Sequence, residues 1–252
     1  MKISIINYDI IDSTNSEALK QSRLGAAEGL CISARQQTAG RGRHGRTWIS
    51  EIDAGLCFSI ILRPQIETKY LPLMTLMSGV AVHQTLKDLG LNPDIKWVND
   101  ILINEKKICG ILAETTETEQ GLAVIVGIGI NILNSNYPPE MAEIATSIEN
   151  ESDQEIQPST VRDQLISTLI ANIEKFYHIL SQKNGHLAIV DEWGNRSSFV
   201  EGKEVRVNLH DEVFIGVTNG LEENGALRLL LPDGSIRIIN SGEVGRVRAQ
   251  IT

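Results

Sequence analysis

The sequence has few cysteines and no pattern that would pair them or hold a metal. Cys31, Cys57 and Cys109 are the three cysteines among 252 residues, and each lies in an apolar run typical of a strand. An odd number without regular spacing excludes a disulfide framework and a zinc site. We therefore expect three buried free thiols.

A long hydrophobic segment is also missing. The N-terminus has no basic region followed by an apolar region and a small-residue cleavage site, which excludes a signal peptide. The longest uncharged apolar stretch, around residues 122–133, is too short to span a bilayer. With 42% hydrophobic residues and a pI near 5.1, we expect a globular cytoplasmic protein that makes no membrane contact.

Basic residues are fewer than acidic ones, 23 against 32. The formal net charge of −9 argues against an extended track for nucleic-acid phosphates, so we expect no specific DNA binding. A Walker loop is absent as well, because no Gly-Lys-Ser/Thr follows a glycine-rich segment.

Against this background, residues 37–48 (QTAGRGRHGRTW) stand out, because three glycines alternate with three arginines. Strand-like runs at 30–35 and 56–62 flank the stretch, which predicts a loop between strands. Glycine allows close backbone approach to a ligand, and successive backbone N–H groups can cradle an anion. Arginine adds a charged fork for carboxylate or phosphate, and Trp48 adds a flat face for a ring. The stretch predicts a hinged loop that binds a small anionic ligand.

Three other interpretations of this loop compete with this prediction. The spacing Gly40-x-Gly42-x-x-Gly45, with Asp53 as the acidic residue, matches a dinucleotide fingerprint. That fingerprint requires a helix at its third glycine, and residues 46–54 leave too little room for one. Nucleic-acid binding conflicts with the net charge, and the composition disfavours a loop without function.

The N-terminal region predicts a strand at 3–11 and a helix at about 15–23. Thr14 and Glu17 fit a capping box. Ser13, Thr14 and Asn15 have two readings: they cap the helix and nothing more, or they form a polar ligand site at its N-terminus. Spacing alone favours the first reading.

The middle of the chain predicts an antiparallel meander. Residues 95–104 (IKWVNDILIN) form a β-rich run, residues 107–115 the returning strand, and residues 122–132 a third strand. An Asp or Lys within a central strand is expensive to bury unless it is paired. Asp100 and Lys107 therefore either point to solvent or line a site together with the glycine–arginine loop.

Helices are predicted at 71–89, at 158–180 with one apolar stripe, and at about 187–193, with a polar irregular stretch between 134 and 157. From about residue 202, short strands alternate with Gly, Asn and Asp turns, as in a small β-barrel. We expect two domains, residues 1–200 and residues 201–252, the second leaning on the first.

Several motifs, in this order and spacing, resemble those of biotin–protein ligases. They are Ser13-Thr14-Asn15, QTAGRGRHGRTW, KWVND at 96–100, KICGILAE at 107–114 and GIGIN at 127–131, followed by Gly-Ala-Leu at 225–227. The resemblance covers nearly the whole chain. It implies an α+β fold of the class II synthetase type, with a mixed or antiparallel sheet packed by helices and a C-terminal SH3-like β-barrel. Because the chain begins directly at the catalytic domain, it resembles the minimal form without a DNA-binding domain.

The resemblance implies a two-step reaction. Biotin and ATP give biotinyl-5′-AMP and pyrophosphate, and biotin then passes to one lysine of a biotin carboxyl carrier protein, such as that of acetyl-CoA carboxylase. Mg²⁺ is implied with ATP, although no metal ligands are assigned. Two anions must be brought together, and Arg43 and Lys107 are the expected catalytic cations.

Matching motifs assign the other site residues. The biotin-binding set comprises Ser13, Thr14, Asn15, Gln37, Gly40, Arg41, Gly42, Arg43, Lys107 and Gly110. The ATP-binding set comprises Arg43, Arg46, Trp48, Lys96, Asn99, Asp100 and Asn131. Two positions depart from the family pattern: His44 replaces an arginine common in relatives, and Val98 replaces a proline. We expect His44 to affect the mobility of the loop more than the chemistry, and Val98 to loosen the strand locally while Asn99 and Asp100 stay in place.

Two alternative functions stay open at this point. A lipoate–protein ligase or lipoyl transferase shares the fold and the adenylate chemistry, and a catalytically silent biotin sensor shares the ligand. The glycine–arginine loop and GIGIN favour biotin, and a sensor would not need Lys107. A homodimer is possible.

Overall fold

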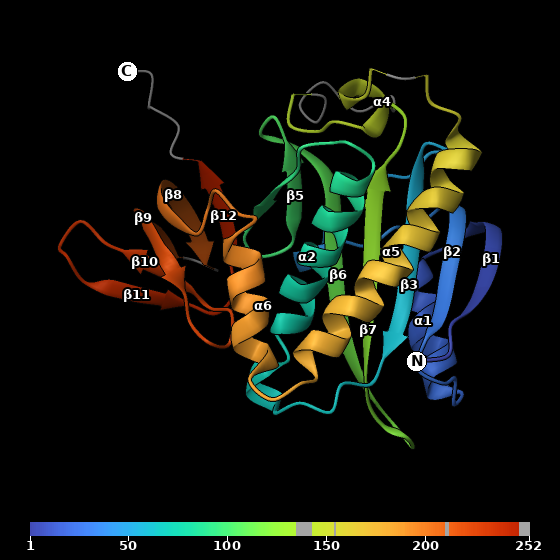
Figure 1. Ribbon diagram of the computed structural model, residues 1–252, viewed down its shortest axis with the longest axis horizontal. Coiled ribbons are helices and arrows are strands. Elements are labelled where there is room, and N and C mark those ends of the chain that lie inside the picture. The colour runs from blue at the N-terminus through green and yellow to red at the C-terminus, as the bar shows by residue number, and fades with distance from the viewer. Residues whose placement is uncertain (135–142, 154, 210–211, 247–252) are drawn as a thin grey trace.

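Two β-sheets organise the chain in the computed structural model, which describes residues 1–134, 143–153, 155–209 and 212–246 (Figure 1). The larger sheet has seven strands in the order β1-β2-β3-β7-β6-β5-β4. Only β1 and β2 pair in parallel, and the other neighbours are antiparallel. The strands are β1 Ser4–Ile11, β2 Leu30–Gln37, β3 Gly55–Leu62, β4 Asp94–Lys96, β5 Asp100–Ile103, β6 Lys106–Thr118 and β7 Gly121–Asn131. The expected mixed α+β fold is confirmed.

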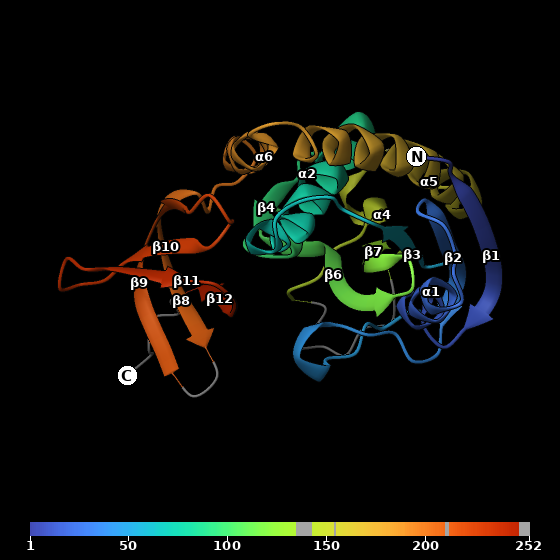
Figure 2. The ribbon, with the colours of Figure 1, turned by 90° about the horizontal axis from the view of Figure 1, so that it is seen from below.

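Helices cover the two faces of this sheet unequally. On one face lie α2 (Leu73–Asp88), α5 (Pro158–Leu180) and α6 (Gly185–Gly194). The opposite face carries α1 (Thr14–Arg23) and the glycine–arginine loop, as Figure 2 shows from below. The second face therefore carries fewer helices than the first.

The main core lies between the sheet and the helices. All five members of the apolar stripe predicted on α5 are buried: Leu165, Leu169, Ile173, Phe176 and Leu180. Alternate residues of β3 point into the same core, with Leu56, Phe58, Ile60 and Leu62 fully buried. A smaller apolar cluster seats α1 on the other face through Ala18, Ile32, Ile61, Ala123 and Ile125. The three cysteines are buried and free, as expected.

The run at 95–104 is not one strand, which corrects the sequence prediction. It folds back on itself as β4 and β5, which pair with Lys96 opposite Asp100. The turn between them places the indole of Trp97 in the core, where Nε1 donates to the carbonyl oxygen of Gly225 at 2.9 Å. Val98, in a cis peptide with Trp97, therefore lies in a turn rather than in a strand. A buried tryptophan with a distant partner fixes this bend, and local β-propensity does not reveal it.

The capping prediction was wrong by one position. Ser13, not Thr14, is the N-cap of α1, and its hydroxyl accepts from the backbone N–H of Ser16 at 3.4 Å. Glu17 instead accepts from Gln21 at 2.7 Å. Thr14 is thereby free to use its side chain elsewhere. The stretch predicted as irregular at 134–157 contains one short helix, α4 (Ile148–Glu151), and its residues 135–142 and 154 lie outside the described part.

The smaller sheet has five antiparallel strands in the order β11-β10-β9-β8-β12. They are β8 Glu201–Leu209, β9 Glu212–Leu221, β10 Leu227–Leu230, β11 Ile236–Ile239 and β12 Glu243–Arg246. Among the described residues β11 does not pair with β12, so the closure expected of a barrel is not seen there. Val205, Leu227 and Ile239 join the same core as α2, so the small sheet leans on the large one.

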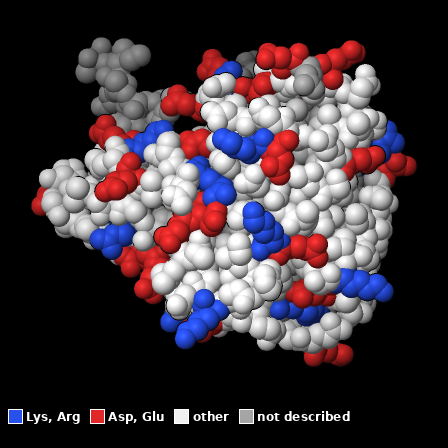
Figure 3. Space-filling model, in the orientation of Figure 1, with Lys and Arg blue, Asp and Glu red and all other residues white. Residues whose placement is uncertain are grey.

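Charges on the helical face are interspersed. Lysine and arginine alternate with aspartate and glutamate over this face, with no broad field of positive charge (Figure 3). Within the described residues, no helix is long and apolar enough to cross a membrane.

His83 on α2 should make stability depend on pH. Burial, with Arg196 and Lys87 nearby, lowers the pKa of His83 to about 4. The unfolded chain takes up this proton near pH 6.5, so the free energy of unfolding should fall as pH drops from about 6.5 towards 4. His83→Met should reduce that slope by up to about 1.4 kcal/mol per pH unit in urea titrations.

Replacing the exposed His178 of α5 by methionine is the matched control for losing a histidine. Equal pH slopes for the wild type and His83→Met would contradict the prediction.

Candidate active site

A cavity of about 610 Å³ opens on the sheet face that carries α1. The glycine–arginine loop, strands β5 to β7 and the small sheet's β8 and β12 form its walls. All residues predicted to form the site line it except Gly40. Those that line it are Ser13, Thr14, Asn15, Gln37, Arg41, Gly42, Arg43, Arg46, Trp48, Lys96, Asn99, Asp100, Lys107, Gly110 and Asn131. Asp100 and Lys107 thus line a site with the loop, as the second of their two readings predicted.

Gly40 lies at the base of the loop, opposite Trp48. A Cβ atom on this residue would lie 2.3 Å from the carbonyl oxygen of Trp48, so a side chain there is excluded. The backbone N–H of Trp48 donates to the Gly40 carbonyl oxygen at 2.9 Å, and Gly42 N–H donates to the Arg46 carbonyl at 2.7 Å. These bonds make the loop a narrow hairpin whose tip is one 3-10 turn, Arg43–Gly45. His44 lies at this tip in the left-handed region, with φ of 54°.

One end of the cavity is a polar corner. The side-chain oxygen of Gln37 accepts from the Thr14 backbone N–H at 2.7 Å and from the Thr14 hydroxyl at 3.0 Å. Ser59 of β3, fully buried, lies 2.8 Å from the Thr14 hydroxyl and 2.6 Å from the amide oxygen of Asn15. The Asn15 amide nitrogen donates to Glu114 at 2.9 Å. The orientation of each amide is therefore fixed before any ligand binds.

Trp48 lies flat on a bare patch of the sheet. Gly110 and Gly129 are register partners on β6 and β7. A Cβ on Gly129 would lie 2.4 Å from the indole, and one on Gly110 would lie 3.1 Å from it. The Lys107 Nζ is 5.8 Å from the ring centroid. Two facing glycines thus create the space that an aromatic ring occupies.

The cavity is cationic although the chain is acidic. Six basic side chains and three carboxylates line it: Arg41, Arg43, Arg46, Lys96, Lys107 and Arg206 against Asp100, Glu105 and Glu243. Asp100 forms ion pairs with Lys107 at 2.6 Å and with Lys96 at 3.8 Å. Burial lowers the pKa of Lys96. Excess positive charge in a partly buried cavity favours an anionic ligand.

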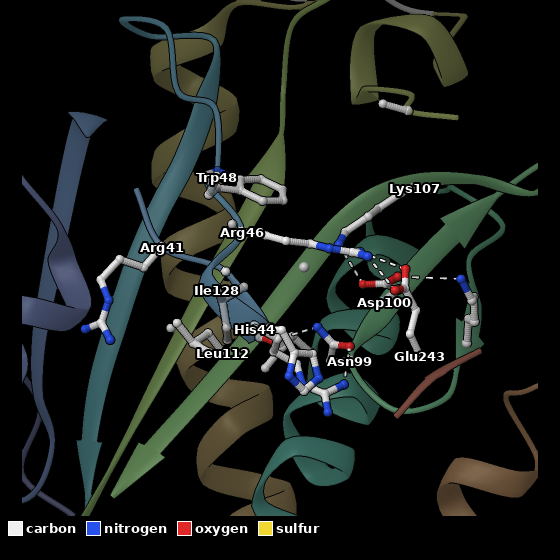
Figure 4. A pocket seen from close by; sticks show the side chains of 18 of the residues that line it. Arg41, His44, Arg46, Trp48, Asn99, Asp100, Lys107, Leu112, Ile128 and Glu243 are labelled. Carbon is white, nitrogen blue, oxygen red and sulfur yellow. Dashed lines mark hydrogen bonds and ion pairs between the residues drawn. The ribbon is translucent and has the colours of Figure 1, made fainter. Parts of the chain in front are cut away.

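The three loop arginines have different partners. Arg41 pairs with Glu114 at 2.6 Å, and Arg46 with Glu243, whose Oε1 accepts at 2.7 Å. Figure 4 shows Arg46 extended towards the group formed by Lys107, Asp100 and Glu243, while Arg41 points away from it. Within the described part of the chain Arg43 has no carboxylate at ion-pair distance.

Arg43 instead donates to the side-chain oxygen of Asn99 at 3.1 Å and to the Gly242 carbonyl at 3.4 Å. Burial lowers the pKa of its guanidinium. Since its hydrogen-bond acceptors are neutral and Asp100 and Glu243 act on it only from beyond ion-pair distance, Arg43 is the loop arginine best prepared to meet an anion.

Two other predicted residues that line the cavity also donate hydrogen bonds to backbone carbonyl groups. The amide nitrogen of Asn99 donates to the carbonyl of Ile111 at 3.0 Å, and that of Asn131 donates to the carbonyl of Thr146 at 2.8 Å. Both side chains are thus held in one orientation.

Sequence reasoning missed several residues that line the cavity or hold its lining side chains in place. Ser59 was detectable as a polar residue inside the apolar strand LCFSIIL, and Glu114 ends the motif KICGILAE. Gly242, Glu243 and Arg206 come from the small sheet and had no local signal. Among the described residues, no three His, Cys, Asp or Glu side chains cluster as a metal site. Asp100, between Lys96 and Lys107, offers a single carboxylate there, so the donor set fits an ion held mainly by the phosphates of a nucleotide.

Comparisons with known proteins agree with this geometry. The Biotin/lipoate A/B protein ligase family matches residues 8–131, and the Biotin protein ligase C terminal domain matches residues 202–245. The bifunctional ligase/repressor BirA of Bacillus spizizenii is 35% identical over 94% of this chain and 72% of its own length.

The biotin–[acetyl-CoA-carboxylase] ligase of Paracoccus denitrificans is 31% identical over 92% of this chain and 96% of its own length. The biotin protein ligase of Aquifex aeolicus, solved in complex with biotin and ATP, superposes with a TM-score of 0.81 at 29% identity, covering 96% of this chain and 97% of that one. The cavity, the motifs and the extent of these matches together show that the chain belongs to the biotin protein ligase family.

Proposed function

We propose that the chain activates biotin with ATP to biotinyl-5′-AMP and transfers biotin to a lysine of a biotin carboxyl carrier protein. The observation that carries the proposal is Arg43, a loop arginine without a carboxylate partner among the described residues, which faces a cavity shared with Lys107. The family relatives named above support biotin as the acid and ATP as the activator. We also propose residues 1–200 as the catalytic domain and residues 201–252 as the C-terminal domain.

The polar corner suits the head of biotin. Fixed amides and hydroxyls of Thr14, Asn15 and Gln37 present donors and acceptors in one arrangement, which favours a polar ring over a purely apolar one. The acid chain of the ligand then runs from this corner towards Arg43 and Lys107. Arg41, held by Glu114, serves the wall of this corner more than the carboxylate.

The chemistry needs two anions in contact. A carboxylate oxygen of biotin attacks the α-phosphorus of ATP, the bond to pyrophosphate breaks, and biotinyl-5′-AMP forms. Arg43 and Lys107 offset the repulsion of carboxylate and phosphate and stabilise the charge that develops. Trp48 and Arg46 lie where the adenylate would be covered, and Lys96, Asn99, Asp100 and Asn131 lie on the phosphate side. Mg²⁺, when bound with ATP, would neutralise phosphate charge next to Asp100.

The second step consumes the mixed anhydride. The neutral ε-amine of the carrier lysine attacks the acyl carbon, AMP leaves with the bonding electrons, and the nitrogen loses a proton. The loop must retain the adenylate until that lysine arrives.

Pyrophosphate exchange into ATP tests the proposal most directly. Exchange that depends on biotin and not on lipoate is expected. Exchange with lipoate alone would support the lipoate alternative, and biotin binding without any exchange would support the silent sensor.

Lys107→Gln should lower the rate of adenylation by about 10²-fold or more, because one preorganised cation is lost beside the reacting carboxylate. Exchange kinetics measure this rate. Lys106→Gln is the matched control, since Lys106 is an exposed neighbour on the same strand and does not line the cavity. Near-normal exchange by Lys107→Gln would remove Lys107 from the mechanism.

Gly129→Ala should raise the KM for ATP by about tenfold, because the added methyl would lie 2.4 Å from the Trp48 indole and displace it. The KM for biotin should change far less. In a Trp48→Ala background the same substitution should add little. An equal effect in both backgrounds would show that Gly129 does not act through Trp48.

Arg43→Gly should still form some adenylate but hold it poorly, since the charged fork is lost and the hinge gains freedom. Leaked adenylate should attach biotin to bystander proteins. The assay incubates the variant with biotin, ATP and an unrelated lysine-rich protein, then detects attached biotin. An unlabelled bystander beside a normally labelled carrier would contradict retention by the loop.

A further inference from the structure

The return arm of the loop, residues 49–54, is bonded to the large sheet. The hydroxyl of Ser50 accepts from the backbone N–H of Gln37 at 3.1 Å, and Asp53 N–H donates to the carbonyl of Arg35 at 3.1 Å. The Ala54 carbonyl accepts from the N–H groups of Ile132 and Leu133, both at 2.9 Å. The arm is therefore fixed to the ends of β2 and β7, whereas the tip of the loop reaches across the cavity.

Asp53 is the most constrained residue of this arm. Its φ of 62° lies in the left-handed region, where a residue other than glycine is uncommon. Its carboxylate accepts from Arg35 through Nε at 2.9 Å and Nη2 at 2.5 Å, a bidentate pair with β2. A second arginine, Arg162 of α5, approaches the same carboxylate with Nη2 at 2.9 Å. Asp53 thus joins the loop to a strand and to a helix on the far face.

Arg162 depends on this contact more than Arg35 does. The Arg162 side chain is only 9% exposed, and its Nε has no hydrogen-bond partner in the described part of the chain. Arg35 is 45% exposed and has a second carboxylate, Asp9, at 3.0 Å. A buried guanidinium is costly without a counter-charge. The hydrogen bonds from Arg35, with Arg162 nearby, lower the pKa of Asp53 to about 2, so the carboxylate is ionised at neutral pH.

We propose that Asp53 is a positioning residue: by bridging Arg35 and Arg162 it fixes the return arm and so holds Trp48 over Gly110 and Gly129. Asp53 does not line the cavity and touches no reacting group. Asp53 therefore affects nucleotide binding indirectly, by fixing the position of Trp48, five residues earlier in the chain. The side chains of the polar corner are held by bonds of their own, and the arm reaches this corner through the Ser50 hydroxyl on the Gln37 backbone N–H, away from Asp53. This inference rests on the proposed function for its kinetic consequence, and on the structure alone for the position of Trp48.

The informative variant is Asp53→Asn, which keeps the size of the side chain and tolerates the left-handed region while it removes the charge. We expect the KM for ATP in pyrophosphate exchange to rise about tenfold, with the KM for biotin changed less than about twofold. The Tm should also fall, because Arg162 loses its counter-charge.

A second substitution separates position from stability. Arg162→Met in the Asp53→Asn background removes the unpaired buried charge, so the Tm should recover while the KM for ATP stays high. If the KM for ATP recovers together with the Tm, or if both KM values rise equally, Asp53 acts only on stability and the proposal fails. Asp9→Asn is the matched control, since it takes the other carboxylate from Arg35 without touching the arm, and it should leave both KM values near wild type.

Tryptophan emission without substrate tests the same inference independently of activity. Trp97 and Trp193 are buried, so a red shift in Asp53→Asn that disappears in a Trp48→Phe background reports movement of Trp48. An unshifted spectrum would overturn the proposal. A wild type that lacks biotin-dependent exchange would instead overturn the proposed function and leave the emission test in force.

Discussion

Mutual repulsion among cations is the constraint on which the arrangement of this protein depends. Six basic side chains share one partly buried cavity, and the fold must hold them together before any anion binds. Carboxylates from separate elements do so: Glu114 of β6, Asp100 of β5 and Glu243 of β12 each pair with a cation. The compensation is incomplete, because Arg43 has neutral acceptors instead. A site with no excess positive charge would not attract two anions.

Two glycines leave the space that the Trp48 ring needs. The absence of side chains at Gly110 and Gly129 leaves a flat area on two paired strands, and Trp48 rests on it. An indole that lies on backbone can shift without dragging neighbouring side chains, and this suits a loop that must open and close. Gly129 of GIGIN thus makes room for a ring that lies about 80 residues earlier in the chain.

The sequence predicted the parts of the fold that local patterns determine. The stripe on α5, the meander of β6 and β7 and the loop of alternating glycine and arginine all follow from periodicity or composition, and the structure confirms them. The resemblance supplied the set of residues that gather at the cavity, although their individual roles stay predictions. What failed depended on distant partners. The bend at Trp97 follows from a bond to Gly225, and the place of Glu243 in the site follows from how the small sheet packs.

The bonds from Arg43 to Gly242 and from Arg46 to Glu243 also determine when, during synthesis, the site can form. They join residues 197 to 199 positions apart in the chain. During synthesis the seven-stranded sheet and its loop emerge first, because chains are made from the N-terminus. The loop tip then has no partner until β12 has left the ribosome. A nascent chain therefore cannot close its own cavity until β12 has emerged, and the site is complete only once that strand has folded beside the loop.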